Sequence, residues 1–109
     1  MTEDRISALL AMLGRGQDSS LLRFSLGNEY SGAGRFEEAA GHLRQAVRLD
    51  RNYSAAWELL GRVLANLERD DEAIAAYREG IAVAEQNGDR QAVKEMTVFL
   101  KRLLKKQGG

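Results

Sequence analysis

Cysteine and proline are both absent from this 109-residue chain. The absence of cysteine excludes disulfide bonds, thiolate nucleophiles and cysteine-ligated metals. The absence of proline leaves glycine as the only strong interruption of a helix, and alanine, leucine, glutamate and arginine, which favour helices, are abundant. We therefore expect an all-α protein.

Net charge is also absent, because 16 basic side chains balance 16 acidic ones. Without a global field, the chain has no general attraction to nucleic acid or to an anionic membrane. No apolar run approaches the length of a membrane span, and the acidic start at Glu3-Asp4 is unlike a basic secretion signal. We expect a cytoplasmic protein that forms one domain over residues 1–109, with no nucleic-acid or membrane partner.

Only the C-terminal end is locally basic, with Lys101, Arg102, Lys105 and Lys106 close together. Such a segment could contact nucleic acid or anionic lipid. No aromatic side chains alternate with these charges for base stacking, however, and cations are favourable near the C-terminus of any helix. The expected role of this basic end is structural.

Apolar residues recur at helical spacing in six segments of the chain. Capping residues and glycines separate these segments, as expected for helices joined by short turns. The expected boundaries are a cap at Thr2, a cap at Asp18 or Ser19, starts near Arg35, Ser54 and Asp70, and a glycine stop at Gly88 before a cap at Asp89.

The middle of the sequence repeats after thirty-four residues. A fixed period of this length predicts helical units that stack side by side, each covering the apolar face of the next. The residues that recur are Leu26-Gly27, Arg35, Glu38-Ala39 and Arg44, which return as Leu60-Gly61, Arg69, Glu72-Ala73 and Arg78.

The repeated positions resemble the tetratricopeptide repeat (TPR), in which a tryptophan, a Leu-Gly pair, small residues and aromatics stand in a thirty-four-residue frame. The matching residues are Trp57, Leu60-Gly61, Ala73, Tyr77 and Gly80 in one unit, and Leu26-Gly27, Tyr30, Ala39, Leu43 and Ala46 in the other. The resemblance implies a TPR-like α-solenoid of about six antiparallel helices. Its parts would be an N-terminal helix (1–16), two repeats (20–53 and 54–87) and a C-terminal capping helix (88–107).

Two glycines fall in the middle of expected helices, where glycine costs about 1 kcal/mol relative to alanine. We expect Gly27 and Gly61 to be compensated by close approach of the second helix of each pair. Small residues on that second helix, such as Ala39 and Ala73, fit this interpretation. The larger side chains expected to fill the space between helical hairpins are Tyr30, Leu43, Trp57 and Tyr77.

Catalytic residues are not evident in the sequence. The carboxylates Asp70-Asp71-Glu72 are expected to be solvated in the first turn of a helix, where they complement its dipole. The single histidine, His42, is expected to be exposed and to have no special role, because one histidine makes neither a zinc site nor a catalytic triad. We expect no enzyme activity, no cofactor and no metal.

The resemblance implies that function lies on the inner wall formed by the first helix of each pair. Such a groove would bind a peptide or helix of an unidentified protein partner, with asparagines bonding its backbone and an arginine pairing with a carboxylate. In one alternative, Glu58 and Arg62 merely satisfy each other, since they stand four residues apart. The candidate groove residues are Phe24, Asn28, Glu58, Arg62 and Asn66.

A second possible function is self-association, through a homodimer or a larger homo-oligomer. The C-terminal amphipathic helix carries Phe99, Leu100, Leu103 and Leu104, which is more apolar surface than one neighbouring helix covers. On this hypothesis the chain is a structural module, and the helix over 88–107 makes the contact.

Overall fold

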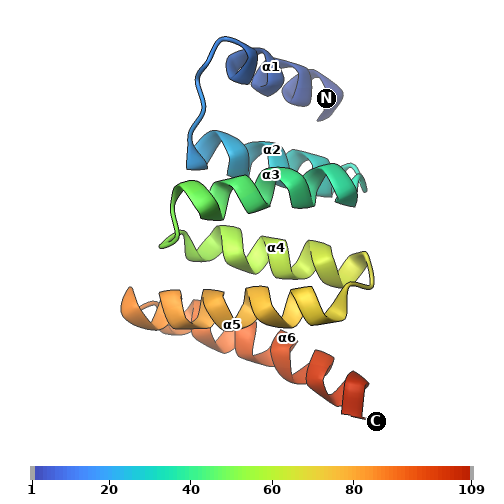
Figure 1. The fold of residues 1–109 in the computed structure, drawn as a ribbon, viewed down its shortest axis with the longest axis vertical. Coiled ribbons are helices and arrows are strands. Elements are labelled where there is room, and N and C mark those ends of the chain that lie inside the picture. The colour runs from blue at the N-terminus through green and yellow to red at the C-terminus, as the bar shows by residue number, and fades with distance from the viewer. Residues whose placement is uncertain (1, 109) are drawn as a thin grey trace.

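The computed structural model describes residues 2–108, and within that range the protein consists of six α-helices and no strands (Figure 1). The expected all-α helical-repeat fold is therefore confirmed. The helices are α1 (Thr2–Gly14), α2 (Ser20–Gly32), α3 (Phe36–Leu49), α4 (Ser54–Asn66), α5 (Asp70–Gln86) and α6 (Arg90–Gly108).

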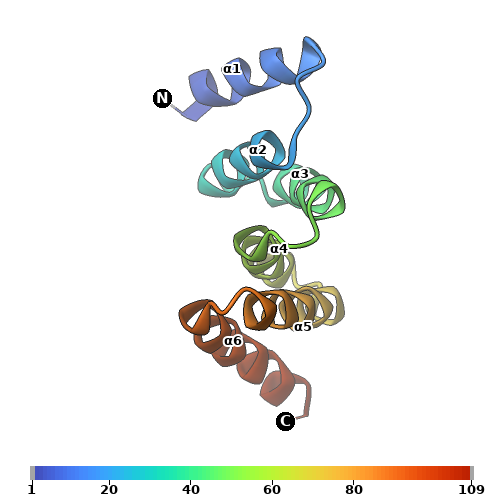
Figure 2. The same cartoon turned by 90° about the vertical axis from the view of Figure 1, so that its left-hand side faces the viewer.

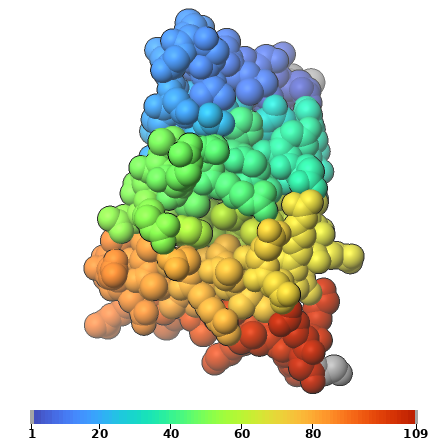
Figure 3. Space-filling view, in the orientation of Figure 1, coloured from blue at the N-terminus to red at the C-terminus, as the bar shows by residue number. Residues whose placement is uncertain are grey.

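The helices form two layers that run the length of a molecule measuring 45 × 28 × 20 Å (Figure 2). We call α2, α4 and α6 the inner layer and α3 and α5 the outer layer. The pairs α2–α3 and α4–α5 are antiparallel hairpins, and α6 packs on α5 as α4 packs on α3. In contrast, α1 contacts α2 alone among the described helices. The face seen in Figure 3 is formed largely by the outer-layer helices α3 and α5, with α1 above them and the end of α6 below.

Side-chain caps fix the starts of two helices where the sequence predicts them. The Ser19 hydroxyl accepts a hydrogen bond from the Leu22 amide at 3.1 Å, and Asp89 Oδ1 accepts one from the Ala92 amide at 3.0 Å. These bonds satisfy amides that have no partner inside the helix. The expected glycine stop before α6 is also present, since Gly88 has a φ of 73°.

The turns that close the two hairpins use different residues for the same backbone shape. Gly34 has a φ of 74°, whereas Glu68, thirty-four residues later, has a φ of 59°. A residue with a Cβ is strained in this left-handed region by about 1–2 kcal/mol. The first repeat therefore has an unstrained turn and the second a strained one.

Replacing Glu68 with glycine is expected to raise the free energy of unfolding by about 1 kcal/mol, because glycine removes this strain. Urea unfolding followed by circular dichroism measures the change. Glu68→Ala is the matched control: it removes the same carboxylate but keeps a Cβ, so it should bring no comparable gain. Equal stability of the glycine and alanine variants would show that the turn stores no strain.

Close helix approach explains the two mid-helix glycines. A Cβ at Gly27 would lie 2.5 Å from Leu43 Cγ, and a Cβ at Gly61 would lie 2.8 Å from the Tyr77 ring. All four residues are buried. Leu43 therefore fills space inside the α2–α3 hairpin, and not between hairpins as expected. Tyr77 fills space inside the α4–α5 hairpin and also stacks on Phe99 of the next helix, α6, so for Tyr77 the expectation is met in part. The cause is that each glycine leaves a hollow on its own helix, which a side chain of the partner helix fills.

Trp57 ties α4 to its neighbours. Its indole Nε1 donates a hydrogen bond to the Arg51 carbonyl at 2.9 Å, which anchors the turn between α3 and α4. A Cβ added at Gly80, on α5, would lie 2.9 Å from the Cβ of Trp57 and would also meet Met96 of α6. Gly80 thus lets α4, α5 and α6 converge on one point.

Candidate peptide-binding groove

The five candidate groove residues lie on two inner-layer helices, Phe24 and Asn28 on α2 and Glu58, Arg62 and Asn66 on α4. Their exposure differs. Asn28, Arg62 and Asn66 are exposed, whereas Phe24 and Glu58 are half-buried. Their role in binding remains a prediction.

Phe24 and Asn28 open onto a hollow of about 450 Å³ between α1 and α2, which Ala8 and Leu9 line from the other side. The Phe24 ring also rests against Tyr53, at the start of α4, with the ring centroids 5.0 Å apart. A half-buried phenylalanine can contact an apolar side chain of a ligand, and the exposed amide beside it can form hydrogen bonds to the ligand's backbone. The three candidates on α4 do not line this hollow.

Glu58 occupies an electrostatically unfavourable place on the inner layer. Burial raises the pKa of its carboxyl, the nearby carboxylates Glu95 and Asp89 raise it further, and Arg62 opposes them. Within residues 2–108, no ion pair joins Glu58 to Arg62 within 4 Å, so the two side chains do not satisfy each other as the alternative interpretation requires. The Arg62 guanidinium is left facing solvent.

Sequence reasoning missed the contribution of α1 and α6 to this face. Among the α1 residues that line the hollow, Leu9 falls at the repeat position of Leu43, but Arg5 stands where the repeats have alanine, so the pattern gave only a weak signal for α1. Glu95 was missed for another reason. α5 is three residues longer than α3, 17 against 14, and the connection after it is one residue shorter. α6 therefore begins two residues later than a strict thirty-four-residue period predicts. The expected Asp89 cap already carries this shift, because a strict period from the Ser19 cap would place it at residue 87.

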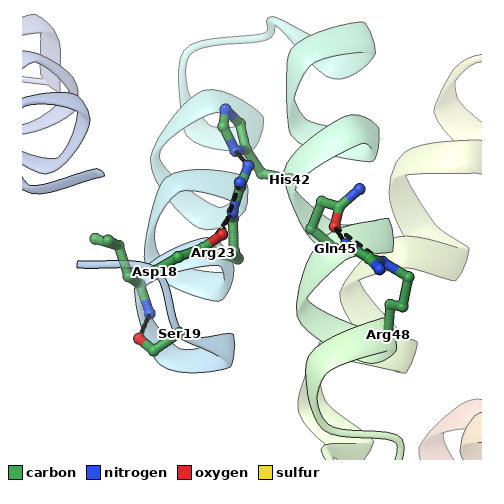
Figure 4. Close-up of polar contacts among 7 residues, drawn as sticks. Asp18, Ser19, Arg23, His42, Gln45 and Arg48 are labelled. Carbon is green, nitrogen blue, oxygen red and sulfur yellow. Dashed lines mark hydrogen bonds and ion pairs between the residues drawn. The ribbon is translucent and has the colours of Figure 1, made fainter. Parts of the chain in front are cut away.

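His42 is not the exposed residue that the sequence suggested. It is half-buried, its ring stacks on Tyr30 with centroids 5.4 Å apart, and its Nδ1 lies 3.1 Å from Arg23 Nη1. Arg23 is held in turn by Asp18, through bonds of 2.8 and 3.0 Å (Figure 4). Because arginine only donates, Nδ1 is the acceptor and the ring is neutral. This polar chain stands where the second repeat has Trp57.

The environment of His42 predicts a pH effect. Burial lowers its pKa below the ordinary value of 6.5, and the nearby charge of Arg23 adds to this effect. The unfolded chain then binds the proton more readily than the folded one. The resulting stabilisation is present above pH 6.5 and is lost as pH falls through the lower pKa of the folded state.

We expect the free energy of unfolding to fall less for His42→Gln than for the wild type when the pH is lowered from about 7.5 to about 5, as measured by urea unfolding. Carboxylates that titrate in this window are common to both proteins, so the difference isolates His42. If the two proteins lose the same free energy of unfolding, His42 does not contribute.

The carboxylates at the start of α5 are not simply solvated, which corrects the sequence interpretation. The Asp70 side chain is only 16% exposed, and its Oδ2 pairs with Lys106 Nζ at 2.9 Å. Asp71 accepts a hydrogen bond from Gln107 at 2.7 Å. One oxygen of Asp70 is buried without a hydrogen-bond partner in the described structure. These contacts fasten the basic end of α6 to α5, a role that local sequence could not reveal.

The apolar side of α6 is divided between core and surface. Leu103 is buried, Phe99 and Leu100 are half-buried, and Leu104 is 39% exposed. The Phe99 ring stacks on Tyr77 of α5 with centroids 5.8 Å apart. Most of the apolar surface proposed for a homodimer is therefore already used within the chain.

Other kinds of site have little support in the described structure. Residues 2–108 contain no group of three or more histidine, aspartate or glutamate side chains placed to hold a metal ion. No helix in that range is both long and apolar enough to span a membrane.

Comparison with known proteins agrees with the repeat geometry. The tetratricopeptide-repeat family model matches residues 24–89. A Pseudomonas aeruginosa protein named as TPR repeat-containing is 47% identical, over 90% of this chain and 93% of its own length. A Bordetella parapertussis protein solved in solution is 42% identical, with a TM-score of 0.79 over 93% of this chain and 88% of its own.

A more distant solved structure shares the fold alone. The TPR domain of Sgt2 from Aspergillus fumigatus has a TM-score of 0.74 at 24% identity, covering 98% of this chain and 81% of its own. The family match spans most of the chain, and the bacterial relatives align with nearly all of it. The chain therefore belongs to the tetratricopeptide-repeat family.

Proposed function

We propose that this protein is a non-catalytic interaction module that binds a peptide or helix of another protein along its inner layer. TPR domains generally bind other proteins and generally act as scaffolds without catalysis. The finer proposal names Phe24, Asn28, Glu58, Arg62 and Asn66 as contacts. It also places the protein in the cytoplasm, which fits a chain without cysteine.

The observation that carries this proposal is the unused hydrogen-bonding capacity of the inner layer. Among residues 2–108, the side chains of Asn28, Arg62 and Asn66 form no hydrogen bond to other side chains or to the backbone. In contrast, Arg44 of α3 and Arg69, in the turn before α5, form ion pairs with Glu72 and Glu37. Exposed donors without a partner suit the backbone and the charged groups of a ligand.

Glu58 and Arg62 define the expected charge pattern of the ligand. A cation beside Glu58 would relieve its repulsion from Glu95, and a carboxylate would pair with the free guanidinium of Arg62. The bound segment is therefore expected to carry an apolar side chain near Phe24 and charges of both signs farther along.

Selection from a displayed library of peptides and helices, with the purified protein as bait, tests the proposal. Arg62→Glu is expected to weaken the selected ligands at least about tenfold, because it replaces a paired charge with a repulsive one. Asn28→Ala should weaken them less. Isothermal titration calorimetry measures both.

Arg48→Glu is the matched control for charge reversal, because Arg48 is exposed on α3 and bonds only Gln45 on the same helix. It should leave binding unchanged. Ligands that bind Arg62→Glu and the wild type equally, but lose affinity for Arg48→Glu, would place the site on the outer layer and refute the groove.

A further inference from the structure

The first helix continues the repeat backwards, although its sequence hides this. Glu3 forms an ion pair with Arg35, and Glu37 forms one with Arg69, so the same contact recurs thirty-four residues later. Ile6 of α1 is buried, as is Ile74 of α5, two periods later. α1 is thus placed like the outer-layer helices α3 and α5.

This register makes Leu9 the equivalent of Leu43 and Tyr77. Each of those two side chains packs against a glycine on the inner-layer helix of its own hairpin. Leu9 meets no such helix within residues 2–108, because α1 contacts α2 alone. The hollow of about 450 Å³ lies instead at Ala8 and Leu9, with Phe24 and Asn28 opposite. The hollow therefore lies where an inner-layer partner of α1 would pack.

At the C-terminal end, α6 is an inner-layer helix without an outer-layer partner among the described helices. α6 packs on α5 as an inner-layer helix, but no described helix forms an outer partner for it. A stripe at helical spacing, Val93, Thr97, Leu100 and Leu104, remains half-buried or exposed. A hollow of about 570 Å³, which Val93 also lines, opens beside the start of this stripe. Each end of the protein is half of a hairpin.

We propose that copies of this chain associate head to tail, with α6 of one copy lying in the hollow beside α1 of the next. The two helices would pair antiparallel, as α2 pairs with α3. The contact joins two different surfaces, so it can extend beyond a dimer. The junction would continue both layers of the solenoid.

Charge complementarity supports a second copy as the occupant. Antiparallel pairing brings the last turn of α6, with Lys105, to the first turn of α1, with Asp4. Lys106 and Glu3 lie in the same turns but already pair with Asp70 and Arg35 within the chain. Opposite charges therefore meet along the junction.

A specific ion pair is expected across the same junction. Within the chain, Arg44 of α3 pairs with Glu72 of α5 at 3.5 Å. The equivalent of Arg44 one repeat later is Arg78, and the equivalent of Glu72 on the next copy's α1 is Asp4. Neither Arg78 nor Asp4 has an ion-pair partner among residues 2–108. Head-to-tail association gives each a partner of opposite charge.

Arg5 limits how tightly the junction can close. It stands at the position of Ala39 and Ala73, where a small side chain lets the two helices of a hairpin approach. Its guanidinium pairs with Glu29 at 3.0 Å on the edge of the hollow. Arg5→Ala is therefore expected to strengthen association several-fold, whereas a residue outside the junction would have no such effect.

Sedimentation velocity over a wide concentration range tests the proposal. The wild-type mass should rise with concentration and pass that of two chains. Leu9→Glu, which blocks the head, and Leu104→Glu, which blocks the tail, should each remain a single chain. An equal mixture of these two variants retains one intact head and one intact tail, so it should form a dimer and nothing larger.

Each alternative result is distinct. A wild-type mass of one chain at every concentration overturns the proposal. A wild-type mass that stops at two chains, with no dimer in the mixture of variants, shows a symmetric contact and also overturns it. Circular dichroism must show that both variants retain the wild-type helix content.

Charge exchange avoids any dependence on the partly buried Leu9. Arg78→Asp and Asp4→Arg should each weaken association by about threefold to fivefold, and the double variant should recover it. Additive losses in the double variant would contradict the expected ion pair. The groove proposal is tested separately, because ligand binding can be measured at concentrations where the protein is a single chain.

Discussion

Tyr77→Ala is expected to lower the free energy of unfolding by about 3–5 kcal/mol, the usual range for removing a buried aromatic ring. The ring is 1% exposed, lies against Gly61 and stacks on Phe99. Its loss would leave a cavity where α4, α5 and α6 meet. Because single domains are stable by only about 5–15 kcal/mol, much of the protein should unfold at moderate urea concentrations.

Urea unfolding followed by circular dichroism measures this loss, and Tyr77→Phe is the matched control. Phenylalanine keeps the ring and its packing, so it should cost far less than alanine. If both variants lose the same free energy of unfolding, the hydroxyl group rather than the ring supports this part of the core.

Gly27→Ala is expected to destabilise the protein by about 1–3 kcal/mol, although alanine favours helices more than glycine does. The added Cβ would lie 2.5 Å from Leu43 Cγ and 2.6 Å from Leu43 Cδ2. Leu43 is fully buried, so it has little room to move. The clash should outweigh the gain in helix propensity.

Gly41 provides the matched control, because it lies in the middle of α3 and a Cβ there meets nothing within 4 Å. Gly41→Ala should raise the free energy of unfolding by about 0.5–1 kcal/mol. Opposite signs for the two alanine variants are the expected result in urea unfolding. A stabilising Gly27→Ala would mean that α2 and α3 are not held together as closely as the structure shows.

The sequence predicts the packing of the repeats because each repeated residue has a local reason for its place. Ser19 and Asp89 cap helices, Gly88 ends one, and Gly27 and Gly61 admit a neighbouring side chain. These functions depend on residues nearby or on one paired helix. The thirty-four-residue period then fixes which helices meet.

The groove is less predictable, because its properties come from residues distant in sequence. The pKa of Glu58 depends on Glu95, whose position follows from three extra residues in α5 and a connection one residue shorter after it. The polar chain at His42 forms because Arg23 replaces a tryptophan and finds Asp18 beside it. Neither arrangement has a repeating signal, so the structure was needed to find them.

The central claim is that the inner layer, and not the outer one, receives a protein ligand. The most direct measurement is a nuclear magnetic resonance titration of the isotope-labelled protein with a peptide obtained by library selection, at a concentration where the protein is a single chain. We predict that the largest amide and side-chain shifts fall at Phe24, Asn28, Glu58, Arg62 and Asn66. Shifts confined to the outer-layer helices α3 and α5 would contradict the claim.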